Sequence, residues 1–226
     1  DTWLMEGLAN YSALMMLEET KGKKEAAAVL LRYRDNLLVS LGEGRIVDDA
    51  GPILWGERLI NSRDRGSWNT ITYEKGAWIF HMLRARMGDD AFFRMLKAMP
   101  TQFARQPLTT AAFQQFAAGF LPAKAPDADL EEFFSQWVES TGIPRIELST
   151  TVSGKAPRVT VNASLTQTMV SKEFGTMAPV VIRFARGPAE TRWVHTSSDV
   201  EEYSWTFRAA PARVELDPDW LILRRE

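Results

Sequence analysis

The 226-residue sequence contains no cysteine, which excludes disulfides, thiol catalysis and thiolate metal ligands together. Histidine is nearly as scarce, because only His81 and His195 are present and they lie in different halves of the chain. No HExxH, GxSxG or phosphate-binding glycine motif occurs. Since neither histidine has a recognisable partner for a metal site or a catalytic triad, we expect structural or surface roles for both.

An excess of charge of one sign is also absent, because the formal net charge is −2. The sequence therefore offers no basic field for nucleic acid and no polybasic patch for a lipid surface. No run approaches the roughly 20 apolar residues that a membrane span requires. We expect neither a nucleic-acid partner nor a membrane span in this segment. The lack of cysteine fits a cytosolic or an exported protein equally well.

The periodicity of apolar residues changes near residue 145. Before it, the spacing is about 3.6, and glycines follow the periodic segments, as is typical of helices. After Pro144 the spacing becomes 2, and glycine and proline separate short segments, as in antiparallel strands. The pattern predicts an α+β protein with a helical part at residues 1–145 and a β-sandwich at residues 146–226.

Within the first part, the periodicity predicts six helices and one long connection. The glycine-rich residues 42–71 are expected to form a loop with a short helical turn at most. Asp129 and Glu132 form a capping-box pattern at the start of the last helix. The predicted helices are Glu6–Glu19, Lys23–Leu41, Tyr73–Met87, Asp90–Met99, Thr110–Ala118 and Asp129–Thr141.

Glu6 is the first candidate for a functional side chain. On a helix beginning near Glu6, its face is shared by mostly small or apolar residues, which suggests a carboxylate at the head of a buried stripe. Burial of such a carboxylate costs free energy unless a cation or hydrogen-bond donors contact it. The alternative is a glutamate at a helix start, favoured by the helix dipole. The residues that share its face are Ala9, Asn10, Ala13 and Leu17.

Tyr73 is the second candidate. Thr72 is expected to be the N-cap of a helix that places Tyr73 at its first position. A tyrosine hydroxyl at a helix entrance can donate a hydrogen bond to a developing oxyanion, as a carbonyl-addition transition state requires. The alternative is an ordinary buried tyrosine.

Together, the segments around Glu6 and Tyr73 resemble the gluzincin aminopeptidases of the aminopeptidase N family. Those enzymes carry HExxH, eighteen further residues, and a glutamate in a Trp-Leu-Asn-Glu-Gly-Phe-Ala-like segment. Some sixty to seventy residues later, a Tyr-Glu-Lys-Gly segment opens a helix. Here residues 3–9 read Trp-Leu-Met-Glu-Gly-Leu-Ala and residues 73–77 read Tyr-Glu-Lys-Gly-Ala. Further similarity follows in order along nearly the whole chain, at residues 51–59, 82–93, 134–144 and 214–218.

The resemblance implies a fold and an activity. Residues 1–145 would be the helical C-terminal lobe of a thermolysin-like peptidase domain, and residues 146–226 a β-sandwich domain. Glu6 would be the third protein ligand of a catalytic zinc, and Tyr73 would stabilise the oxyanion of the tetrahedral intermediate. The expected reaction is the removal of an N-terminal amino acid from a peptide.

The resemblance also implies that this chain is a fragment. The HExxH motif and the Gly-x-Met-Glu-Asn segment of the family would lie upstream of Asp1, so we expect the chain alone to be metal-free and inactive. Truncation would expose apolar surface, which favours self-association or partial disorder near residues 1–20 and 42–72. A metal-free, peptidase-like scaffold and a protein-interaction module formed by the β part remain alternatives.

Overall fold

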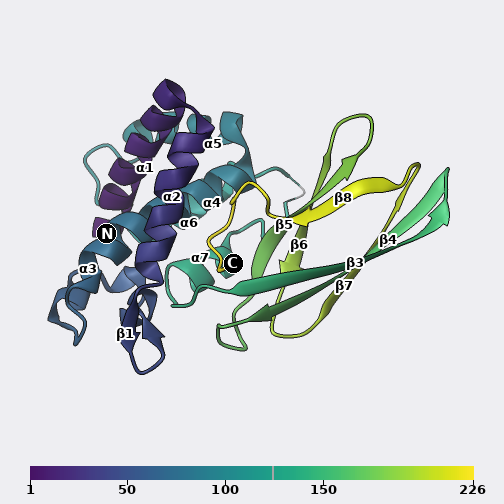
Figure 1. Cartoon of the computed structure of the whole chain (residues 1–226). Helices are drawn as coiled ribbons and strands as arrows, with labels where there is room; N and C mark the ends of the chain where they lie inside the picture. Colours follow the sequence, from purple (N-terminus) through teal and green to yellow (C-terminus); the bar gives the residue numbers. More distant parts are fainter. Residues whose placement is uncertain (124) are drawn as a thin grey trace. The chain divides into compact units, whose positions relative to one another are not determined.

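The computed structural model describes residues 1–123 and 125–226, which form two compact units, 1–141 and 142–226 (Figure 1). The first unit is helical apart from one short hairpin, and the second consists of antiparallel sheets. This combination confirms the predicted α+β class. In the described part of the chain, no helix has the length and apolar character that a membrane crossing requires.

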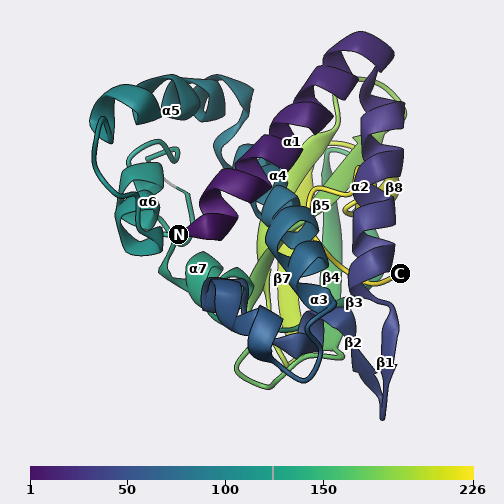
Figure 2. The same cartoon turned by 90° about the vertical axis from the view of Figure 1, so that its left-hand side faces the viewer.

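The core of the first unit is built where α1 packs on α4 (Figure 2). Trp3 of α1 lies against the rings of Phe80 and Phe113, with centroids 5.9 and 6.3 Å away. The indole nitrogen of Trp3 donates a hydrogen bond of 2.9 Å to Thr110, so the polar edge of this buried ring has a partner. The main helices are α1 (Thr2–Lys21), α2 (Lys23–Leu37), α4 (Gly76–Met87), α5 (Asp89–Gln102), α6 (Thr110–Ala118) and α7 (Glu131–Trp137).

The connection between α2 and α4 is more structured than the sequence predicts. The expectation of a loop at residues 42–71 is wrong, and the expected helix Lys23–Leu41 ends earlier, at Leu37. Turns of 3₁₀-helix and two- or three-residue strands are too short to produce a recognisable period. The connection contains β1 (Ser40–Gly42), β2 (Arg45–Ile46), η1 (Val47–Ala50), η2 (Ile53–Asn61), α3 (Ser67–Asn69) and the π-helix η3 (Thr70–Lys75).

Two predicted helix starts are also wrong. Thr72 is not an N-cap, because the backbone is already helical at Asn69 and continues without interruption through η3 into α4. The start of α7 is capped mainly by Asp127, whose carboxylate accepts hydrogen bonds from the backbone of Glu132 (3.1 Å) and Phe133 (3.0 Å). Asp129 accepts one from Glu131. The capping pattern was therefore placed two residues too late in the sequence.

The second unit contains two three-stranded antiparallel sheets, ordered β3-β4-β7 and β6-β5-β8. The sheets are joined by a hydrogen bond of 2.7 Å from Thr196 to Gln167 and by the rings of Phe184 and Phe207, 5.3 Å apart. Alternate residues of β4 are buried, as a strand with one covered face requires. The strands are β3 (Arg145–Lys155), β4 (Arg158–Thr168), β5 (Thr176–Phe184), β6 (Glu190–Thr196), β7 (Glu201–Phe207) and β8 (Pro211–Leu216).

The segment after β8 is organised by the buried carboxylate of Asp217. It accepts hydrogen bonds from the backbone of Leu221 (2.6 Å) and Ile222 (3.4 Å) and from the side chain of Arg224 (3.3 Å). Burial raises the pKa of Asp217 to about 7, although these donors and Arg224 oppose the shift. One carboxylate that accepts several hydrogen bonds therefore fixes the C-terminal segment of the second unit.

Candidate active site

Glu6 lies in the second turn of α1 and is half-buried. The prediction that it heads a buried stripe is wrong, because Ala9 and Ala13 are exposed. The helix begins at Thr2, and its packing on α4 turns the neighbouring face toward the core. The buried face of α1 consists of Trp3, Leu4, Gly7, Tyr11 and Leu14.

Tyr73 lies in η3, and the structure brings it to Glu6 although the two are far apart in the sequence. The Tyr73 hydroxyl lies close to the Glu6 carboxylate, where η3 contacts α1. The interaction with Glu6 raises the pKa of Tyr73, because a phenolate could not donate a hydrogen bond to the carboxylate and would face its negative charge. At neutral pH the hydroxyl is thus protonated and keeps the hydrogen that a donor requires.

The segment that carries Tyr73, η3, is a π-helix. A π-helix is rare, and single π-turns within helices occur frequently at functional sites. Between α3 and α4 the chain stays helical, but residues 70–75 follow the wider π turn. Because the wider turn changes the angle between successive side chains, it determines which way Tyr73 points. The amino-acid composition of a segment does not predict such a π-turn.

Trp68 packs beside the candidate tyrosine. Its ring lies 6.0 Å from that of Tyr73 at 82°, an edge-to-face arrangement. The indole nitrogen of Trp68 is buried, and within residues 1–123 and 125–226 no hydrogen-bond partner is found for it. The contact restricts where the Tyr73 side chain as a whole can lie, and so restricts the positions that its hydroxyl can reach.

The two residues after Tyr73 attach η3 to other elements. Glu74 accepts hydrogen bonds of 3.1 and 3.0 Å from the Asn36 amide of α2, and burial raises the pKa of Glu74. Lys75 forms an ion pair of 2.8 Å with Asp48 of η1, in which both side chains are fully buried. Lys75 also donates to the backbone oxygen of Ser140 at 3.4 Å. Consecutive residues of the Tyr-Glu-Lys segment thus contact α1, α2 and η1 in turn.

Sequence reasoning missed the pair of Lys75 and Asp48, although one signal was present. Lys75 occupies a helical face with Ile71 one turn before it and Ile79 one turn after it, and both isoleucines are fully buried. A charged residue in such a row requires a buried partner of opposite sign. The partner was not predictable, because Asp48 lies in the segment that was predicted to be a loop.

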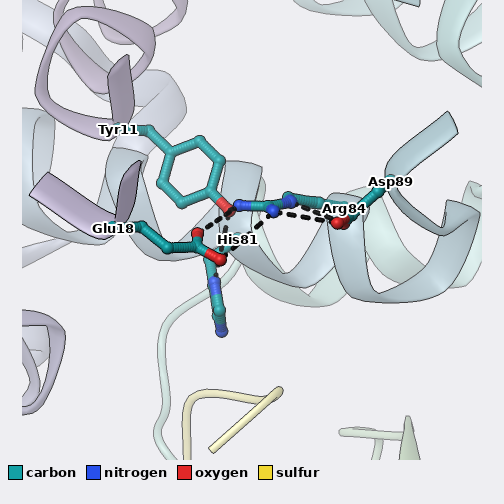
Figure 3. Close-up of polar contacts among 5 residues, drawn as sticks. All are labelled: Tyr11, Glu18, His81, Arg84 and Asp89. Carbon is teal, nitrogen blue, oxygen red and sulfur yellow. Dashed lines mark hydrogen bonds and ion pairs between the residues drawn. The ribbon is translucent and has the colours of Figure 1, made fainter. Parts of the chain in front are cut away.

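A second polar cluster lies where the C-terminal ends of α1 and α4 meet the start of α5 (Figure 3). Arg84 of α4 bonds Glu18 of α1 and Asp89 of α5, each at 2.7 Å, and contacts the Tyr11 hydroxyl at 3.5 Å. Tyr11 also lies 3.3 Å from His81, and burial raises the pKa of Tyr11 to about 12. The side chains satisfy one another, which is how a structural network behaves.

The described residues supply no complete set of ligands for a metal ion. In the part of the chain that the structure describes, no three His, Asp or Glu side chains gather closely enough to hold an ion. The pair of Glu6 and Tyr73 offers one carboxylate, whereas a catalytic zinc takes three protein ligands. These residues therefore do not form a zinc site by themselves.

Comparison with known families identifies the class of protein. Residues 1–137, which include both Glu6 and Tyr73, match the peptidase family M1 domain. The chain belongs to peptidase family M1.

Two curated relatives are aminopeptidases. The chain is 33% identical over 134 residues to aminopeptidase N of Caulobacter vibrioides, covering 59% of this chain and 15% of that protein. It is 29% identical over 76 residues to human aminopeptidase O, covering 33% of this chain and 9% of the relative. The chain thus spans less than a sixth of the length of either protein.

A solved structure shares the fold. The crystal structure of Legionella pneumophila aminopeptidase A in complex with aspartic acid matches with a TM-score of 0.63 and 18% identity. The match covers 99% of this chain and 24% of the Legionella chain. At this identity the similarity concerns the fold alone, and it extends over both units.

Proposed function

We propose that this chain is part of a zinc aminopeptidase that removes N-terminal amino acids from peptides. The observation that carries the proposal is the close approach of the backbones at Gly7 and Gly76, which brings Glu6 near Tyr73 and so joins the two segments that resemble the family's motifs. Membership of peptidase family M1 and similarity to two aminopeptidases support it.

In this proposal the two residues have different roles. Glu6 is a carboxylate ligand of zinc, and the other two protein ligands are histidines of an upstream HExxH motif. When bound, the zinc polarises the scissile carbonyl and acidifies its water. The Tyr73 hydroxyl lies close to Glu6, so it would also lie near a substrate held beside that residue. Tyr73 then donates a hydrogen bond to the oxyanion as negative charge develops there.

The proposal assigns each part of the chain a place in the parent protein. Residues 1–145 are the helical C-terminal lobe of a thermolysin-like peptidase domain, and residues 146–226 are a β-sandwich domain. Because Glu6 is the single ligand proposed within residues 1–226, the isolated chain should be inactive and should not bind zinc stoichiometrically at Glu6. Exposed Met5 and Met16 on α1 are consistent with apolar surface available for self-association.

The experiment uses a longer form of the protein that includes the expected HExxH motif, supplied with zinc. We expect it to hydrolyse an aminoacyl anilide with a free amine and to leave the N-acetylated anilide intact, since an aminopeptidase requires the free amine. Equal cleavage of both compounds would contradict the proposal. A folded, zinc-loaded protein with no turnover would indicate another substrate class, and a folded protein without zinc would favour the scaffold alternative.

A further inference from the structure

Two glycines lie where α1 crosses α4. A Cβ atom added at Gly7 would lie 2.7 Å from the Cα of Gly76, and one added at Gly76 would lie 2.7 Å from the Cα of Gly7. The obstructing atoms belong to the backbone, so no side-chain rotation can relieve the overlap. Gly76 has ordinary helical dihedrals, φ −55° and ψ −45°. These glycines are therefore required for close approach of the helices and not for an unusual backbone conformation.

This crossing is adjacent to the pair of Glu6 and Tyr73. Gly7 follows Glu6 directly, and Gly76 lies one turn after Tyr73. The distance between the two backbones at the crossing consequently limits how far the Tyr73 hydroxyl must reach. A side chain at either glycine would push the helices apart at the point where the carboxylate and the hydroxyl meet.

We propose that Gly7 and Gly76 are positioning residues, whose missing side chains set the separation at which Tyr73 reaches Glu6. The effect of the glycines on catalysis rests on the proposed function, but their effect on the separation of Tyr73 and Glu6 does not. Neither glycine touches a reacting group, so both act through Glu6 and Tyr73.

Thermal stability provides the first test, because helix propensity and backbone overlap change the melting temperature in opposite directions. Alanine is the better helix former, so propensity alone predicts that Gly7→Ala raises the melting temperature. Overlap of the backbones predicts a fall of several degrees for both Gly7→Ala and Gly76→Ala. Gly66→Ala is the control, since a Cβ there meets no atom within 4 Å and φ is −65°. A rise in both test variants would overturn the proposal.

The second test measures geometry without zinc or turnover. In chain labelled at tyrosine and glutamate, we expect a nuclear Overhauser effect between the Tyr73 ring and the Glu6 side chain. The effect should persist in Gly66→Ala and disappear in folded Gly7→Ala, with Gly76→Ala altering the same contact from the opposite helix. An undiminished effect in both glycine variants would overturn the inference.

The third test separates positioning from a general loss of structure. In the longer protein we expect Gly7→Ala to lower kcat roughly 100-fold, the scale of a misplaced catalytic group. Added to Tyr73→Phe, the same change should lower kcat by a smaller factor than it does alone, because the part of its effect that acts through the Tyr73 hydroxyl is already lost. Equal losses in the two backgrounds would overturn the positioning role. If the longer protein has no peptidase activity at all, the proposed function fails while the Overhauser measurement still decides the geometry.

Discussion

Tyr73→Phe is expected to lower kcat of the longer, zinc-loaded protein by roughly 100- to 1000-fold, the usual effect of losing one oxyanion donor. KM should change little, because the hydroxyl acts on charge that develops in the transition state and not in the bound substrate. The aromatic ring and its contact with Trp68 remain in this variant, so the loss reports on the hydroxyl. Steady-state hydrolysis of a free-amine aminoacyl anilide measures both constants.

Tyr33→Phe is the matched control for this experiment. Tyr33 is a half-buried tyrosine of α2 in the same unit, and burial raises its pKa as well. Its hydroxyl has no role in the proposed site, so kcat should stay within about twofold of the parent value. If Tyr73→Phe lowered kcat no more than Tyr33→Phe does, Tyr73 would not be the oxyanion donor.

Lys75→Met is expected to lower the free energy of unfolding of the first unit by about 3–5 kcal/mol. The substitution removes the cation that pairs with the fully buried carboxylate of Asp48, and the cost of burying that charge without Lys75 dominates. Replacing both members, by Lys75→Met with Asp48→Leu, should restore most of the loss, because an apolar pair carries no such charge. Urea denaturation followed by the circular dichroism of the helices gives the three values.

The pair of Arg63 and Glu43 supplies the control for the ion pair. These side chains lie 3.5 Å apart and are each 74% exposed, so Arg63→Met should cost less than about 1 kcal/mol. If Lys75→Met cost no more than Arg63→Met, or if the double variant were no more stable than Lys75→Met, burial of the charge would not be the cause.

The sequence predicted those elements whose residues repeat at a regular spacing. The helix at Thr110–Ala118 was predicted at its observed bounds, and Thr109 caps it by accepting a hydrogen bond from the backbone of Ala112. The turns of η2 and the start of η3, before Tyr73, were not predicted, because 3₁₀- and π-helices depart from the 3.6-residue period. Boundaries failed where tertiary packing or a π-turn extended a helix beyond its expected cap, as at Thr72.

The candidate site was predictable as residues but not as an arrangement. Glu6 and Tyr73 were each selected for their chemistry and their neighbours, and the resemblance paired them. Their proximity depends on a crossing of two helices with no intervening side chain, which Gly7 and Gly76 permit. Nothing in the spacing of one chain indicates which two glycines will meet. The roles of Glu6 and Tyr73 in catalysis remain predictions.

The affinity for zinc, measured in the longer protein with and without Glu6→Ala, tests the central claim most directly. Loss of residues that only support a metal ligand already weakens binding about 10- to 100-fold, so losing a ligand should exceed that range. The control is Glu19→Ala, which removes an exposed carboxylate from the same helix and should leave the affinity unchanged. The account predicts one tightly bound zinc per chain in the parent protein and the control, with a dissociation constant raised more than 100-fold in Glu6→Ala. Equal affinity in Glu6→Ala and the parent protein would contradict the assignment of Glu6 and the active site built on it.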